Sequence, residues 1–207
     1  MRAHFLVYDR FTALDAIGPY EVISRLPNVT LRVVSRRRGE VRADTGALAL
    51  IADEAIDEVK ETDLLLVPGG PGSRDLLADG HLLEWLREID ATTQWTTSVC
   101  TGSLVLAAAG LLEGRKATTH WTCLELLAGF GARPTSHRVV RDGKYVTAAG
   151  VSAGIDMALS LAQTIGGRDV AESIALGIEY DPEPPVNAGS PAKARPEIIE
   201  AVRRRIG

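Results

Sequence analysis

Residues 95–106 read WTTSVCTGSLVL, and this stretch decides the fold. Residues 95–99 are rich in threonine and end in valine, which predicts a β-strand. Residues 102–112 are apolar on nearly every side, which predicts a helix packed deep inside the domain. Cys100 lies between the two. A strand, a sharp turn and a buried helix are therefore expected in direct succession.

The same alternation of strands and helices extends in both directions from this stretch. Residues 5–8 and 63–67 are short apolar runs, as expected of strands buried on both faces of a parallel sheet. Asp142-Gly143 predicts a tight antiparallel hairpin within residues 138–147. Further expected elements are a strand at 31–35, an alternating stretch at 48–51, helices near 18–26, 82–89, 121–127, 155–165 and 170–179, and an extended run at 181–185. The pattern predicts one α/β domain over residues 1–207, with a mostly parallel sheet and helices on both faces.

Composition excludes several classes of protein. The chain has 207 residues, of which 45% are hydrophobic and 24% charged, as in soluble globular proteins. A formal net charge of -4 provides no broad positive field, so nucleic acid is not expected as a partner. No stretch is long and apolar enough for a membrane helix, so no membrane partner is expected either. Two cysteines are too few for a disulfide scaffold, which favours a reducing, cytoplasmic location.

Cys100 is the first candidate for chemistry. The carboxyl ends of parallel strands line the cleft in such folds, and three loops reach that edge: those after Tyr8, Val67 and Val99. A helix that begins beside Cys100 favours a thiolate, so a lowered pKa is expected if Cys100 is a nucleophile. The alternative is a small apolar residue buried at the end of a strand. The pattern alone favours neither interpretation.

Other candidates each have a structural alternative. Asp15 either points into the cleft or caps a helix, and capping is favoured. His120 either acts as a base toward Cys100 or is a half-buried histidine, and the second is favoured. Cys123 lies in an amphipathic stretch and is interpreted as packing, although a disulfide to Cys100 stays open. The histidines and cysteines lack metal-ligand spacing, so no metal is expected.

The glycine-rich turn at residues 68–72 also has two interpretations. Gly70 and Gly72 belong to the sequence PGGPG, which follows a predicted strand. The turn either aims backbone N–H groups at a developing anion or is merely a tight turn. It lacks the pattern of a phosphate-binding loop.

Taken together, these motifs resemble those of the DJ-1/PfpI superfamily. They occur in the family's order and span nearly the whole chain. The matching pieces are LDxxGP at 14–19, PGGxG at 68–72, SVCTGSLVL at 98–106, ATTHW at 117–121, GxxAGID at 150–156 and PPxNAGSP at 184–191. The resemblance implies a flavodoxin-like three-layer sandwich with a small antiparallel hairpin, the class I glutamine amidotransferase-like fold. It also implies a homodimer.

The resemblance is closest to the isocyanide hydratases and implies a function. By this resemblance Cys100 is the nucleophile, Asp15 is its carboxylate partner, and Thr101 helps to position water or substrate. Gly70, Gly72 and His120 are the expected substrate-binding residues. The implied reaction is that of a hydro-lyase, which adds water to a small isocyanide (R–N≡C) through a covalent cysteine thioimidate and yields an N-substituted formamide. Neither cofactor nor metal is implied.

Two departures bear on the alternatives within the superfamily. Peptidase-like members carry histidine directly after the cysteine, where this chain has Thr101, which disfavours a protease. Glyoxalase-like members typically use glutamate where this chain offers Asp15, which weakens a glyoxalase or deglycase interpretation. A redox-sensing or binding module of the same fold, in which peroxide oxidises Cys100 without turnover, is the alternative from another class. Related domains occur fused to helix-turn-helix regulators, but no DNA-binding module is expected here.

Overall fold

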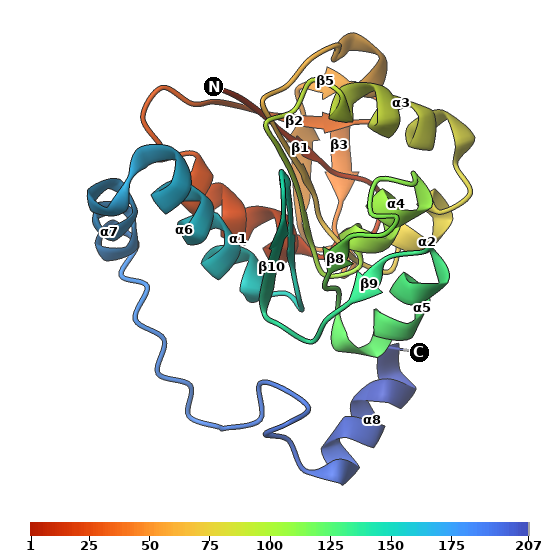
Figure 1. Cartoon of the computed structure of the whole chain (residues 1–207), viewed down its shortest axis with the longest axis vertical. Helices are drawn as coiled ribbons and strands as arrows, with labels where there is room; N and C mark the ends of the chain where they lie inside the picture. The colour runs from red at the N-terminus through yellow and green to blue at the C-terminus, as the bar shows by residue number, and fades with distance from the viewer. Residues whose placement is uncertain (207) are drawn as a thin grey trace.

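Seven strands form the central sheet of the computed structural model, which describes residues 1–206 (Figure 1). Their order across the sheet is β10-β11-β7-β6-β1-β2-β5. Only β10 and β11 pair antiparallel, and the remaining neighbours are parallel. The strands are β1 (Arg2–Leu6), β2 (Thr30–Ser35), β5 (Glu54–Ala55), β6 (Leu64–Val67), β7 (Trp95–Val99), β10 (Val139–Asp142) and β11 (Tyr145–Ala148). The predicted mostly parallel sheet is confirmed.

Helices cover both faces of this sheet, as Figure 1 shows. One face carries α1 (Ala13–Ile23), α6 (Ala153–Gly166) and α7 (Arg168–Gly177). The other carries α2 (Ser73–Leu76), α3 (Gly80–Asp90), α4 (Gly102–Ala108) and α5 (Leu124–Gly129). Each face has its own hydrophobic core, because successive side chains of a strand point to opposite faces. Leu65 of β6 belongs to one core and Leu66 to the other. The flavodoxin-like three-layer sandwich is therefore confirmed.

Smaller elements lie outside the central sheet. They are the antiparallel pair β3 (Gly39–Arg42) and β4 (Ala49–Ala52), the parallel pair β8 (Lys116–Ala117) and β9 (Arg133–Pro134), and the short 3-10 helices η1 (Ile56–Glu58) and η2 (Trp121–Cys123). The predicted turn at Asp142-Gly143 joins β10 to β11, and Gly143 has a φ of +64°. That positive φ is why glycine suits this position.

Several helix boundaries differ from the expectation, and those of α1 and α4 differ most. Helix α1 begins at Ala13, not near Gly18, so Pro19 lies inside the helix and not in its first turn. The sequence signals misled because proline marks a first turn more often than an interior. Helix α4 ends at Ala108, before the predicted end at 112, because the chain turns at Gly110 with a φ of +83°.

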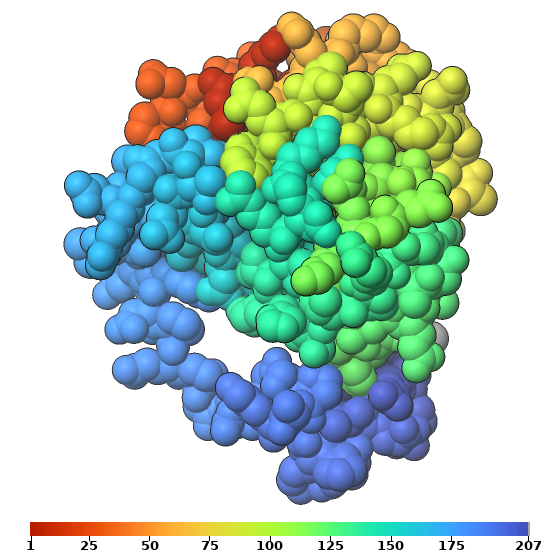
Figure 2. Space-filling view, in the orientation of Figure 1, coloured from red at the N-terminus to blue at the C-terminus, as the bar shows by residue number. Residues whose placement is uncertain are grey.

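The C-terminal part of the chain leaves the sandwich and returns to it. Residues 178–195, here called the strap, contain no helix or strand, and the run at 181–185 is exposed, as expected. The strap leads to α8 (Pro196–Ile206), which the sequence analysis did not predict. Helix α8 reaches the body through the Ile206 carbonyl, which accepts from Arg74, and through Arg203 above the Trp121 ring. Figure 2 shows an opening between the strap and the body. None of the helices within residues 1–206 has the length and apolar character needed to cross a membrane.

Candidate active site

Three loops meet at the carboxyl edge of the sheet because β1, β6 and β7 are neighbours in its centre. Parallel strands end at the same edge, so the segments that follow them lie side by side. Asp15 follows β1, Gly69 follows β6, and Cys100 follows β7. Residues far apart in sequence therefore form one site.

Cys100 occupies a strained turn between β7 and α4. Its φ is +55°, a left-handed conformation that costs a non-glycine residue roughly 1–2 kcal/mol. The Cys100 N–H donates to the carbonyls of Ala148 and Ala149 at 3.1 and 2.8 Å. The Cys100 carbonyl accepts from the hydroxyls of Thr119 and Ser103 at 2.9 and 3.1 Å. These hydrogen bonds hold the strained residue in place, as in the nucleophile turns of hydrolases.

Two glycines let the neighbouring loop approach this turn. A Cβ atom on Gly102 would lie 2.1 Å from the Val67 carbonyl oxygen, and one on Gly69 would lie 2.5 Å from the Thr101 nitrogen. Neither distance is compatible with a side chain. The glycines therefore bring the segment after β6 into contact with Cys100 and Thr101.

Asp15 is a completely buried carboxyl beside the thiol. Its side chain is 0% exposed, Oδ2 accepts from the Gly69 N–H at 2.9 Å, and Oδ1 has no hydrogen-bond partner. Burial raises the pKa of Asp15 to about 7; the Gly69 N–H and the Cys100 thiol oppose this rise, whereas the charge of Asp44 adds to it. The capping interpretation is wrong, because Thr12 occupies the N-cap position and Asp15 lies inside α1.

The Cys100 thiol is more weakly acidic than expected. Burial raises its pKa well above the ordinary value, and the charge of Asp15 raises it further, while hydrogen bonds from Thr101 oppose both effects. The expected lowering of this pKa is therefore wrong. Helix α4 has only seven residues, and its partial charge does not outweigh burial and a neighbouring acid. At neutral pH Cys100 is a thiol that needs a base when it reacts.

The side chain of Thr101 fastens the glycine loop to the turn. Its Oγ1 accepts from the Gly70 N–H at 2.9 Å and from the Ser73 hydroxyl at 3.0 Å. Gly70 has a φ of +135°, which favours glycine. The Gly72 N–H donates to the Arg10 carbonyl at 3.2 Å. The N–H groups of Gly70 and Gly72 are thus paired within the protein, and the loop orients the site.

The remaining sequence candidates lie around this centre. His120 is half-buried, its Nδ1 lies 2.7 Å from the Thr122 hydroxyl, and burial lowers its pKa. Within residues 1–206 no hydrogen bond joins His120 to Cys100. Cys123 is a buried free thiol, as is Cys100, so the two form no disulfide in this structure.

Tyr8 was predicted to end a strand, but β1 ends at Leu6, and Tyr8 lies in the loop that leads to the site. Its ring is buried, and its hydroxyl donates to the Pro68 carbonyl at 2.7 Å. Burial raises the pKa of Tyr8 well above its ordinary value, and the charges of Asp15 and Cys100 raise it further. A buried phenol needs a hydrogen-bond partner, so a tyrosine at the end of an apolar run was the sequence signal that could have identified Tyr8.

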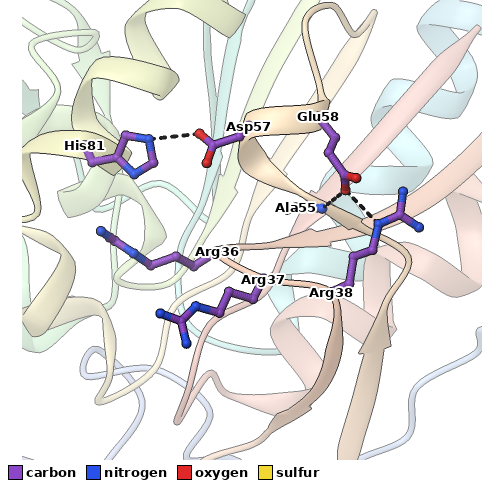
Figure 3. Close-up of a pocket in the computed structure, with 7 residues that line it drawn as sticks. All are labelled: Arg36, Arg37, Arg38, Ala55, Asp57, Glu58 and His81. Atoms are coloured by element: carbon purple, nitrogen blue, oxygen red, sulfur yellow. Dashed lines mark hydrogen bonds and ion pairs between the residues drawn. The ribbon is translucent and has the colours of Figure 1, made fainter.

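A second concave surface lies away from this site, in the pocket of Figure 3. It encloses about 510 Å³ and is lined by Arg36, Arg37, Arg38, Ala55, Asp57, Glu58 and His81. Arg38 donates to Glu58 at 2.7 Å, and His81 lies 2.9 Å from Asp57. This pocket shares no lining residue with the cysteine turn. Across residues 1–206, no group of three or more His, Cys, Asp or Glu side chains is arranged to hold a metal ion.

Known proteins resemble this chain over most of its length. The sequence profile of the DJ-1/PfpI family matches residues 1–164. An isonitrile hydratase from Pseudomonas putida is 43% identical over 201 residues, which cover 97% of this chain and 88% of the hydratase. The HTH-type transcriptional regulator CdhR from Pseudomonas aeruginosa is 33% identical over 184 residues, which cover 84% of this chain but only 54% of the regulator.

Solved structures agree with this family. A THiJ/PfpI family protein from Pseudomonas syringae superimposes with a TM-score of 0.96 at 38% identity, covering 99% of this chain and 85% of that one. Drosophila melanogaster DJ-1beta superimposes with a TM-score of 0.78 at 20% identity, covering 86% of this chain and 97% of that one. The second likeness shows the fold alone.

Proposed function

Because this chain belongs to the DJ-1/PfpI family, we propose that it adds water to an isocyanide and releases an N-substituted formamide. The observation that carries the proposal is the Cys100 turn with Asp15 buried beside it. A carboxyl with a pKa of about 7 accepts and donates protons near neutral pH, which is the property a general acid and base needs. The resemblance to isonitrile hydratase over 97% of the chain supports the choice of substrate class.

The first step joins the cysteine to the substrate. The Cys100 thiol gives its proton to the Asp15 carboxylate while Sγ attacks the terminal carbon of R–N≡C. Asp15 then passes this proton to the same carbon, which yields the thioimidate R–N=CH–S–Cys100. The thiol proton ends on carbon, so no external acid is consumed. A nearby base compensates for the high proton affinity of the thiol.

The second step releases the product. Water adds to the thioimidate carbon, and one proton of the water goes to the Asp15 carboxylate, which passes it to the substrate nitrogen. The tetrahedral adduct then expels sulfur, the hydroxyl proton returns to the thiolate, and the formamide R–NH–CHO leaves. Covalent catalysis divides one slow addition into two easier ones. Thr101 beside the thiol orients the water or substrate in this scheme, and His120 lines the approach.

The limited exposure of the nucleophile suits this substrate class. Cys100 is 7% exposed, so a reactant must present its electrophilic atom at the end of a narrow group. The isocyanide carbon is terminal and the group is linear. A hydrated aldehyde is bulkier at its reacting carbon, and peroxide sensing requires an exposed thiolate, which burial disfavours.

The test is to incubate the protein with phenyl isocyanide and measure N-phenylformamide by chromatography. We expect turnover by the wild type and by Cys123→Ala, and only the uncatalysed rate with Cys100→Ala. Equal rates for wild type and Cys100→Ala would refute the proposal. Lactate formed from methylglyoxal would instead identify a glyoxalase, and Cys100 oxidation by dilute peroxide without turnover would identify a redox module.

We also propose that the protein is a cytoplasmic homodimer. A mostly apolar groove of about 370 Å³ lies between α1 and β4, and its lining includes Tyr20, Leu50 and Ile51. Tyr20 and Ile51 are exposed in the single chain. A second copy that covers this groove would remove that apolar surface from water. Two free thiols suit a reducing compartment.

A further inference from the structure

One peptide group connects Tyr8 to Asp15. The Tyr8 hydroxyl donates to the Pro68 carbonyl at 2.7 Å, and the Gly69 N–H donates to Asp15 Oδ2 at 2.9 Å. The Pro68 carbonyl and the Gly69 N–H are the two ends of the same planar peptide bond. A rotation of this peptide would therefore break both hydrogen bonds at once.

The two hydrogen bonds also reinforce each other. A donor to a peptide carbonyl polarises the peptide and makes its N–H a stronger donor, by perhaps 10–30% per bond. Burial keeps the Tyr8 phenol protonated, so the hydroxyl always donates. The charged form of Asp15 is thus stabilised by an N–H that Tyr8 strengthens and orients.

The adjacent peptide repeats the arrangement. The Thr12 N–H donates to the Gly69 carbonyl at 2.8 Å, and the Gly70 N–H donates to Thr101 Oγ1 at 2.9 Å. Two consecutive peptides therefore connect the loop after β1 to Asp15 and to Thr101. This repeat indicates that the loop after β1 fixes the position of the loop after β6, and that the loop after β6 in turn orients Asp15 and Thr101.

We propose that Tyr8 is a positioning residue for the reaction: through the Pro68–Gly69 peptide it holds and strengthens the hydrogen bond that stabilises the Asp15 carboxylate. Tyr8 acts through another group and does not contact the reacting atoms in this scheme. The inference rests on the proposed role of Asp15, but it concerns the titration of Asp15, which can be measured without substrate.

Few groups affect the pKa of Asp15. Those that act on it are the Gly69 N–H, the Cys100 thiol and the charge of Asp44, and the charges of Tyr8 and Asp15 also interact. The Asp44 carboxylate accepts from the Thr12 hydroxyl at 2.9 Å. None of these groups is a cation, so a weaker Gly69 hydrogen bond has no compensating partner. Loss of the Tyr8 hydroxyl must therefore increase the proton affinity of Asp15.

The experiment is a titration of protein labelled with ¹³C at aspartate carboxyls, with the Asp15 signal assigned by its loss in Asp15→Asn. In Tyr8→Phe, which keeps the ring, we expect Asp15 to titrate roughly half a pH unit higher than in the wild type. Tyr20→Phe removes an exposed hydroxyl from α1, and Tyr145→Phe removes a buried one that binds Asp90; neither should move the Asp15 signal.

A folded Tyr8→Phe protein whose Asp15 titrates as in the wild type would overturn the inference. If Tyr8→Phe does not fold, 3-fluorotyrosine at position 8 gives the opposite test. Its phenol is a stronger donor, so Asp15 should titrate lower, and an unchanged titration would again overturn the inference. The pH profile of isocyanide turnover should shift with the titration. A shifted titration without any isocyanide turnover would refute the proposed function and leave the role of Tyr8 intact.

Discussion

Asp15 is an acid that the fold keeps away from water, and this affects both stability and reactivity. Its carboxyl has no cationic partner among the groups that act on its pKa, and one of its oxygens lacks any hydrogen bond. A buried carboxylate of this kind is costly. This cost falls at a position where the proposed reaction moves a proton near neutral pH.

Asp15→Asn should separate the effect of the Asp15 carboxyl on stability from its effect on reactivity. The carboxyl takes up a proton on folding between about pH 4 and pH 7, because its pKa is 3.8 when unperturbed and about 7 in the native state. The unfolded chain binds fewer protons there, so stability falls as pH rises through this window. The neutral amide avoids this loss, and Asp15→Asn should gain up to roughly 4 kcal/mol over the wild type at pH 8 and little at pH 4.

The same variant should lose roughly 10²–10⁴-fold in isocyanide turnover, since an amide cannot shuttle a proton. Urea denaturation at the two pH values and the formamide assay measure both effects. A wild type that is as stable at pH 8 as Asp15→Asn would contradict the raised pKa of Asp15.

At the scale of single residues, the sequence predicted which residues form the site better than it predicted their protonation states. The position of Cys100 between a strand and a helix was readable from the apolar pattern, and the family resemblance singled out Asp15. The direction of the Cys100 pKa was predicted wrongly, because proton affinity depends on burial and on Asp15, which no local pattern reports. The bond from Tyr8 to Pro68 spans 60 residues and was invisible for the same reason.

The element that matters most is the strand, turn and helix formed by β7, Cys100 and α4. Its geometry depends on a close approach between α4 and the end of β6, which leaves no space for a side chain at Gly102. Strand and helix were both predictable from composition and periodicity. The starts and ends of α1 and α4 were not, because tertiary contacts tolerate Pro19 within one helix and a turn at Gly110 ends the other.

Gly102→Ala should destabilise the protein by roughly 1–3 kcal/mol or more, because the added methyl group would overlap the Val67 carbonyl. Gly80→Ala is the matched control, since that glycine begins α3 and has nothing within 4 Å of an added Cβ. Gly80→Ala should be neutral or slightly stabilising. Thermal unfolding followed by circular dichroism measures both, and equal melting temperatures for the two variants would contradict the close contact.

At the scale of the whole molecule, the order of the strands brings the site together, and the sequence predicted the class of sheet without that order. Alternation of strands and helices implies a parallel sheet but does not say which strands are neighbours. Helix α8 was also missed, because its residues follow a long exposed strap and bury no side chain completely. Its contacts with Arg74 and Trp121 exist only after the rest of the chain has folded.

The proposed dimer is tested by a charge in the groove between α1 and β4. Ile51 is 62% exposed in the single chain, and Ile51→Glu would bury a carboxylate if a second copy covers it. We expect the wild type to have the mass of a dimer by light scattering and Ile51→Glu to have the mass of a monomer. Leu176→Glu on α7, where the native residue is 82% exposed, should remain a dimer. A monomeric wild type would refute the proposed homodimer.

The carbonyls that hold the Cys100 turn are synthesised later than Cys100 itself. The carbonyls of Ala148 and Ala149 accept from the Cys100 N–H; Ala148 ends β11, which pairs with β7, and Ala149 follows it. A nascent chain that has passed Cys100 but not yet reached Ala149 lacks these acceptors. The turn at Cys100 is therefore completed only after the ribosome has added Ala149, and shorter nascent chains lack the two carbonyls that hold it.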